Sequence, residues 1–181
     1  MRILKITGLI LTGLIVLVLG YVGYLYYYHF GRFSIDQEKY PHRIGYIDRT
    51  ESISPKGFTL CSEDIQIGFY SSAAPNAYKG SKYAFRKLIL ENYENRGYTD
   101  SGFLNLRFHV NCKGTVGHVV INEVGMDYKK TELNDDMVNQ LVNLAIKEEN
   151  WNAIIKSEKR RDIYMYLIFK IENGEVLEIL P

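Results

Sequence analysis

Two cysteines and two histidines are the residues of this chain whose chemistry depends most on their spacing. Cys61 and Cys112 are the only cysteines. A bond between them would close a loop of about fifty residues, worth up to about 4 kcal/mol in the chain-entropy model. Outside the cytoplasm such a pair is expected to be oxidised, so we predict a Cys61–Cys112 disulfide; the alternative is two unpaired buried thiols. Without a CxxC motif, the two cysteines indicate no metal site and no redox motif.

The histidine pair is His109 and His118, which flank a turn signal at Lys113-Gly114. If that turn has two residues, the imidazoles face each other across a hairpin on its solvent side, where they could hold a metal ion or sense pH. Two ligands do not make a metal site, and a bulge would break the pairing. The favoured interpretation is therefore a solvated sheet face.

The sequence gives no support to catalysis or to nucleic-acid binding. No catalytic triad, paired catalytic carboxylates or phosphate loop can be assembled from its residues, and we predict neither an enzyme nor a cofactor. The formal net charge is +1, from 22 basic and 21 acidic residues. Because no basic patch stands out, nucleic acid is not an expected partner.

The elements that must position these residues follow residue 78. Residues 102–110 alternate apolar and polar side chains, as a strand with one buried face does, and an apolar run at 116–124 follows the turn. Residues 163–171 alternate again, and Asn173-Gly174 predicts a hairpin into a last strand at 176–180.

Two helices are predicted, one before the first strand and one between the second and third strands. Ser81 is the expected cap of a helix that runs to about residue 94, and Asn134 caps a second helix with acidic residues in its first turn and Lys147 in its last. Trp151 is expected to fill the core between helix and sheet. The mixed charge run at 156–161 is interpreted as a solvated loop. The order helix, strand, strand, helix, strand, strand predicts an α+β fold with a small antiparallel sheet packed with two helices.

The N-terminal region is predicted to be a single-pass membrane anchor in contact with lipid. Residues 6–28 carry no charge and would form a helix roughly 34 Å long, enough to span a hydrocarbon core of about 30 Å. A cleavable signal peptide is the alternative, but the apolar run exceeds a usual h-region. Five tyrosines form an expected interface belt: Tyr21, Tyr24, Tyr26, Tyr27 and Tyr28. We divide the chain into an anchor (1–30), a connecting region partly packed on the domain (31–77) and a domain (78–181).

The domain resembles the C-terminal domain of TonB-like proteins. The matching pieces are the helix ending ENYENRG, the hairpin GFLNLRFHVNCKGTVG, the following helix, Trp151 and the strand pair YMYLIFKIENGEV. Within this family, the hairpin sequence VNCKG resembles a cysteine-containing variant that is seen in uncharacterised proteins of the Bacteroidetes type.

The resemblance implies a periplasmic domain, tethered to the inner membrane by one N-terminal helix, that grips a partner segment by adding it to a sheet edge. Implied partners are an ExbB–ExbD-type motor and outer-membrane transporters, and the implied process is energy-coupled transport. The matching edge would be 163–171 or 175–180, which gives these partner-binding residues: Tyr164, Tyr166, Ile168, Lys170, Val176 and Glu178.

The chain departs from this family at two places. Its apolar helix has no histidine before His29, although the family's helix usually carries a Ser…His pair that engages the motor. The family's long proline-rich spacer is also missing. The alternative function is therefore an anchored periplasmic structural or interaction module without energy coupling.

Overall fold

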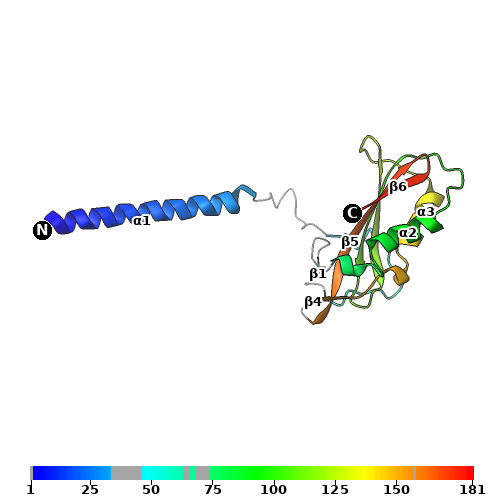
Figure 1. Ribbon diagram of the computed structural model, residues 1–181, viewed down its shortest axis with the longest axis horizontal. Coiled ribbons are helices and arrows are strands. Elements are labelled where there is room, and N and C mark those ends of the chain that lie inside the picture. Colours follow the sequence, from blue (N-terminus) through cyan, green and yellow to red (C-terminus); the bar gives the residue numbers. More distant parts are fainter. Residues whose placement is uncertain (1, 34–45, 63–65, 68–73, 157) are drawn as a thin grey trace. The chain divides into compact units, whose positions relative to one another are not determined.

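The computed structural model describes residues 2–33, 46–62, 66–67, 74–156 and 158–181 (Figure 1). The chain divides into two compact units, Met1–Ile44 and Gly45–Pro181, and each is described here by itself.

The first unit is built on α1 (Arg2–His29), a helix of 28 residues. Its segment Lys5–His29 is long and apolar enough to cross a membrane, and a signal sequence near an N-terminus would meet the same test. The helix is followed by a short 3-10 turn, η1 (Gly31–Phe33). At this end the Arg32 guanidinium lies 4.4 Å from the centre of the Tyr28 ring, a cation–π geometry typical of arginine beside aromatic rings.

The second unit contains a six-stranded sheet. Its strands are β1 (Gln66–Ile67), β2 (Gly102–Val110), β3 (Val116–Gly125), β4 (Ile154–Lys156), β5 (Lys159–Glu172) and β6 (Glu175–Leu180). The central part runs β3-β2-β5, all antiparallel. On the side of β5 away from β2, β6 pairs with its second half and β1 pairs parallel to it at Asp162 and Ile163; β4 pairs with the start of β5.

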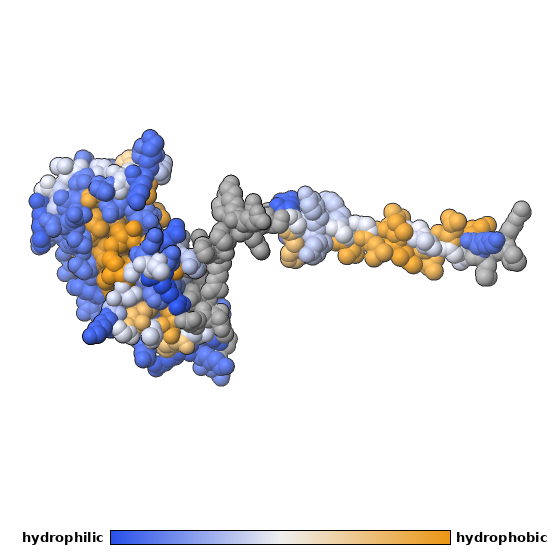
Figure 2. Space-filling view, turned by 180° about the vertical axis from the view of Figure 1, so that it is seen from behind, coloured by the Kyte–Doolittle hydropathy of each residue, from blue (hydrophilic) through white to orange (hydrophobic). Residues whose placement is uncertain are grey.

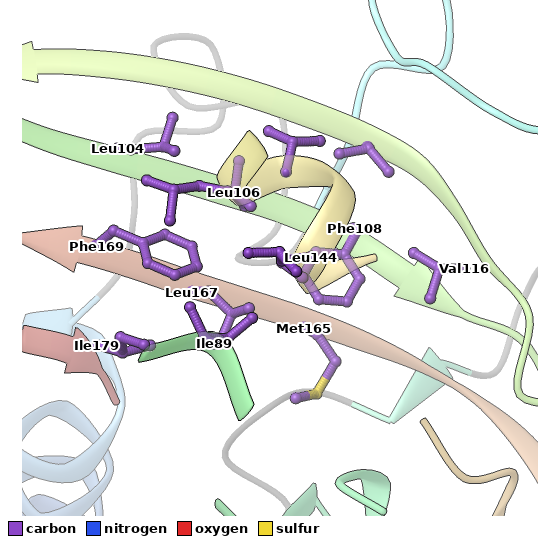
Figure 3. Close-up of a cluster of buried hydrophobic side chains, with 14 of the residues drawn as sticks. Ile89, Leu104, Leu106, Phe108, Val116, Leu144, Met165, Leu167, Phe169 and Ile179 are labelled. Atoms are coloured by element: carbon purple, nitrogen blue, oxygen red, sulfur yellow. The ribbon is translucent and has the colours of Figure 1, made fainter. Parts of the chain in front are cut away.

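The core lies between this sheet and two helices, α2 (Lys82–Asn92) and α3 (Asp135–Ala145). Figure 1 shows both helices on the same face of the sheet. Alternate residues of β2 and β5 point to them, and Figure 3 shows Leu104, Leu106 and Phe108 beside Leu167 and Phe169. All five side chains are buried, as expected for the inner face of a sheet covered on one side.

The predicted α+β class and the order of its six main elements are confirmed as α2, β2, β3, α3, β5, β6. Both predicted caps are also present. The Ser81 hydroxyl accepts a hydrogen bond from the Ala84 amide, and the Asn134 side chain accepts from the amides of Asp136 and Met137. Lys147, however, lies beyond α3, which ends at Ala145.

Trp151 fills the core as predicted. Its ring centre lies 5.1 Å from those of Tyr78 and Phe108 and 5.4 Å from that of Phe85. Its Nε1 donates to the Ala145 carbonyl at the end of α3. The indole therefore joins three aromatic rings and satisfies one of the carbonyl groups that a helix C-terminus leaves unpaired.

One local prediction is wrong, and the condition of a two-residue turn beside the histidines is not met. The charge run is a β4–β5 hairpin, with Ile155 opposite Arg160 and Lys156 opposite Lys159; ladder pairing uses the backbone and therefore tolerates exposed charged side chains. The turn between β2 and β3 has five residues rather than two, since Val110 pairs with Val116. Asn111 stabilises the longer turn, because its Oδ1 accepts hydrogen bonds from the amides of Lys113 and Thr115.

Candidate functional site

One face of the sheet is not covered by α2 and α3, and we call it the open face. Paired residues of neighbouring strands point to the same side of a sheet, so the register assigns the members of this face. They come from four strands: Phe103, Asn105, Arg107, His109, Val120, Asn122, Val124, Tyr164, Tyr166, Ile168, Lys170, Glu172, Glu175, Glu178 and Leu180. Figure 2, seen from behind relative to Figure 1, shows a hydrophobic strip on this side bordered by hydrophilic side chains.

Five of the six residues predicted to bind a partner belong to the open face. Tyr164, Tyr166, Ile168 and Lys170 lie along β5, and Glu178 lies opposite Lys170 on β6. The sixth, Val176, is buried and pairs with the core residue Ile171, so its side chain belongs to the covered face. The open face therefore brings five of the predicted residues together, but Tyr164 is as buried on this face as Val176 is on the covered face, each being 8% exposed.

The backbone of β5 is not an available edge along its second half. Ile168 pairs with Asn105 of β2 on one side and with Leu180 of β6 on the other. Lys170 likewise pairs with Phe103 and Glu178. The expectation that 163–171 offers a sheet edge is therefore wrong for this part, because a strand with partners on both sides has no backbone groups left for a third.

The β3 edge of the sheet is largely closed by two pieces of chain. Ile53 exchanges two backbone hydrogen bonds of 2.8 Å with Val119, and Lys130 forms a bridge with Val124. Between these pieces lies a groove of about 560 Å³, lined by β3 and by residues that include Glu51 and Lys130. The alternation of the ladder leaves the amide and carbonyl of Ile121 facing outward within the groove. This gap is too short to pair with more than a residue or two.

The outer edge of β6 is the longest open edge within the described part of the chain. No backbone hydrogen bond is recorded on that side for any of its six residues among the described ranges. Because Glu178 and Leu180 face β5 in the ladder, the backbone amide and carbonyl of Ile179 face outward. The Leu177 side chain is 49% exposed and Leu180 is 42% exposed. An extended peptide would find both backbone partners and apolar surface here.

The turn before β6 is fixed firmly to the loop that follows α2. The Tyr93 hydroxyl donates a 2.5 Å hydrogen bond to the Gly174 carbonyl. Gly174 has φ 75°, and a Cβ at this position would overlap the Tyr98 carbonyl, so glycine is required for both reasons. Burial, with the nearby Glu175 carboxylate as a lesser cause, raises the pKa of Tyr93 to about 12. The turn from which β6 begins is therefore fixed by a hydrogen bond and by close packing.

The predicted disulfide between Cys61 and Cys112 is confirmed. Beside it lies Asp162, a fully buried residue of β5 that the sequence analysis did not identify. Its Oδ2 accepts hydrogen bonds from the amides of Cys61 and Ser62, and its Oδ1 accepts from the Cys112 amide, all at 2.8 Å. The signal in the sequence was an acidic residue immediately before the alternating apolar run that starts at Ile163.

His109 and His118 meet, although not on a solvated face. A β-bulge after Arg107 places His109 opposite Gly117, yet the Nδ1 atoms of the two histidines lie 3.3 Å apart. His109 is only 2% exposed, so the expectation of a solvated position is wrong. The ring of Phe58 packs edge-on against His118, which shows how the segment before Cys61 covers this corner. Among the described residues, no third metal-ligating group joins the pair.

Comparisons of the chain with protein-family models, with curated proteins and with solved structures found no match.

Proposed function

We propose that this chain is a membrane-anchored binding module that holds an extended segment of a partner protein against the outer edge of β6. The observation that carries the proposal is the run of six residues in β6 without a recorded backbone partner on its outer side in the described ranges. Strand addition obtains affinity from main-chain hydrogen bonds and specificity from alternate side chains. The partner's side chains on one face would continue the open face beside Glu178 and Leu180.

The anchor and the disulfide support a location at the inner membrane, with the second unit in the periplasm. The α1 segment Lys5–His29 is apolar enough to span a membrane, and disulfides persist in oxidising compartments such as the periplasm. Lipid around α1 is then the first partner. The second partner is the protein whose segment adds to β6.

Energy-coupled transport is the second candidate function, favoured by the TonB-like order of elements. In this version an ExbB–ExbD-like motor engages α1, and the segment bound at β6 belongs to an outer-membrane transporter. The apolar helix has no histidine before His29, and the chain has no proline-rich spacer. We therefore place the binding module first and the transducer second.

Photo-crosslinking of the full chain in its membrane tests the binding edge. A photoreactive amino acid at Leu177 is expected to capture a partner, and the attachment point is expected to map to one short extended segment. Leu90 on α2 is the matched control, because its side chain is also 49% exposed. Identical products at both positions, or no product at Leu177, would contradict strand addition at β6.

Co-purification separates the two candidates. The transducer predicts that the intact chain retains ExbB-like proteins in mild detergent and loses them when α1 is replaced by an unrelated apolar helix. The binding module predicts that the Leu177 crosslink persists after this replacement and that no ExbB-like protein is retained by either form.

A further inference from the structure

We propose that Cys61, Cys112 and Asp162 form a binding site for a thiophilic divalent cation, such as zinc, when the disulfide is reduced. The proposal is independent of strand addition at β6. The possible ligand atoms of these three residues, two sulfurs and one carboxylate oxygen, already lie within 4.8 Å of one another. Thiolates and carboxylates are both common zinc ligands. The disulfide and the cation site would therefore be alternative states of the same atoms.

The positions of the two cysteines do not depend on the disulfide alone. The Asp162 carboxylate accepts hydrogen bonds from the backbone amides of both Cys61 and Cys112. Since Asp162 is fully buried within β5, it holds both cysteine backbones against the sheet. A ligand set kept together by such supporting hydrogen bonds needs little rearrangement before it binds a metal.

The distances suit a tetrahedral cation. Zinc–sulfur bonds of about 2.3 Å place two thiolate sulfurs about 3.8 Å apart in a tetrahedron. The two Cα atoms are 6.0 Å apart, so rotation of the cysteine side chains suffices to reach this separation. Asp162 Oδ1 accepts a hydrogen bond only from the Cys112 amide among the described residues, so its second lone pair can reach the cation, whereas Oδ2 accepts from both the Cys61 and Ser62 amides. Cys61 is exposed, so water can occupy the fourth position.

Charge favours the cation in the reduced state. Two thiolates and a carboxylate within 4.8 Å would repel one another, and a divalent cation removes that repulsion. A dithiol reductant supplies the two electrons: its two thiols become a disulfide while Cys61 and Cys112 become thiols. Cation binding then releases one proton from each cysteine. The oxidised chain has no thiolate and is expected not to bind.

The test uses the full chain in detergent, reduced with a dithiol that is then removed without oxygen. Cobalt(II) serves as a coloured probe for zinc. The reduced chain is expected to bind one cobalt per chain with thiolate-to-metal charge-transfer absorption that zinc abolishes. The oxidised chain and the Cys61→Ser/Cys112→Ser variant are expected to give no such absorption. Charge-transfer absorption that is absent from the reduced chain, or present in the double variant, would overturn the proposal.

The role of Asp162 is tested separately. Asp162→Asn is expected to weaken zinc binding by at least about tenfold, the lower end of the loss seen when a group that supports a metal ligand is removed. Asp127→Asn, an exposed aspartate elsewhere, is the control and should bind as the unaltered chain does. X-ray absorption spectroscopy of zinc bound to the unaltered, reduced chain identifies the ligand atoms directly, and its result does not depend on whether a variant folds. It should show two sulfur neighbours at about 2.3 Å with oxygen at about 2.0–2.2 Å; four sulfurs, or unchanged affinity in Asp162→Asn, would refute the site.

Discussion

The ring of Phe58 packs directly on the backbone of Gly117, so that a Cβ atom at position 117 would overlap the ring. Gly117→Ala should therefore displace Phe58 and lower the free energy of unfolding by about 1–3 kcal/mol, the usual cost of overpacking. Denaturant unfolding of the full chain in detergent measures the loss. In a Phe58→Ala background the same substitution should cost much less, and equal costs in both backgrounds would contradict the contact.

Breaking the Cys61–Cys112 bond should destabilise the second unit. The bond joins positions 51 residues apart, and loops of this length gain about 2–4 kcal/mol from a disulfide. Unfolding curves with and without reductant measure the difference. The Cys61→Ser/Cys112→Ser variant is the control and should not respond to reductant. An unaltered chain that is equally stable in both conditions would show that the bond contributes little.

Tyr93 should make stability fall at high pH. Its pKa is raised by burial from 10.0 to about 12 in the folded chain. A raised folded-state pKa means that folding favours the protonated form, so its contribution is complete below pH 10 and is lost as pH rises through about 12. Tyr93→Phe removes the titration and should flatten the stability profile between these values. Unfolding midpoints across this range measure it, and identical slopes for both chains would contradict the prediction.

Trp151→Ala should be among the most destabilising single substitutions. The indole is buried, contacts three aromatic rings and donates to the Ala145 carbonyl. Removing a buried aromatic side chain of this size costs about 3–5 kcal/mol. The control is Tyr83→Ala on α2, whose side chain is 77% exposed; its effect should stay within about 0.5 kcal/mol. Thermal unfolding of both variants gives the comparison.

Local signals in the sequence were sufficient for the main elements. The alternation in 102–110 and 163–171 predicted β2 and β5, and the Ser81 and Asn134 caps predicted where α2 and α3 begin. These features depend on neighbouring residues and on period, which one sequence contains. The disulfide was also predictable, because the chain has only two cysteines to pair.

Features that depend on the order of strands were not predictable from the sequence. The local sequence does not show that β5 is a central strand and β6 an edge strand, because both strands contain apolar residues at alternating or neighbouring positions. Which strand is central depends on the pairing with β2, which is distant along the chain. His109 is buried between the rings of His118 and Tyr164, and Phe58 packs on His118; these contacts join residues distant along the chain. The role of Asp162 was not predictable for the same reason, because the amides from which it accepts hydrogen bonds lie about fifty or a hundred positions away in the sequence.

The covalent bond between Cys61 and Cys112 also determines which part of the chain would bear mechanical load. Tension carried along the backbone from α1 reaches Cys61 and crosses directly to Cys112 at the tip of the β2–β3 hairpin. Residues 62–111, which include α2 and all of β2, lie inside the closed loop and bear none of that tension. A pull on the anchor would thus act on β3 and the strands that follow, and could not unravel α2 and β2 one residue at a time. The oxidised chain is a shorter and stiffer tether than its sequence length implies.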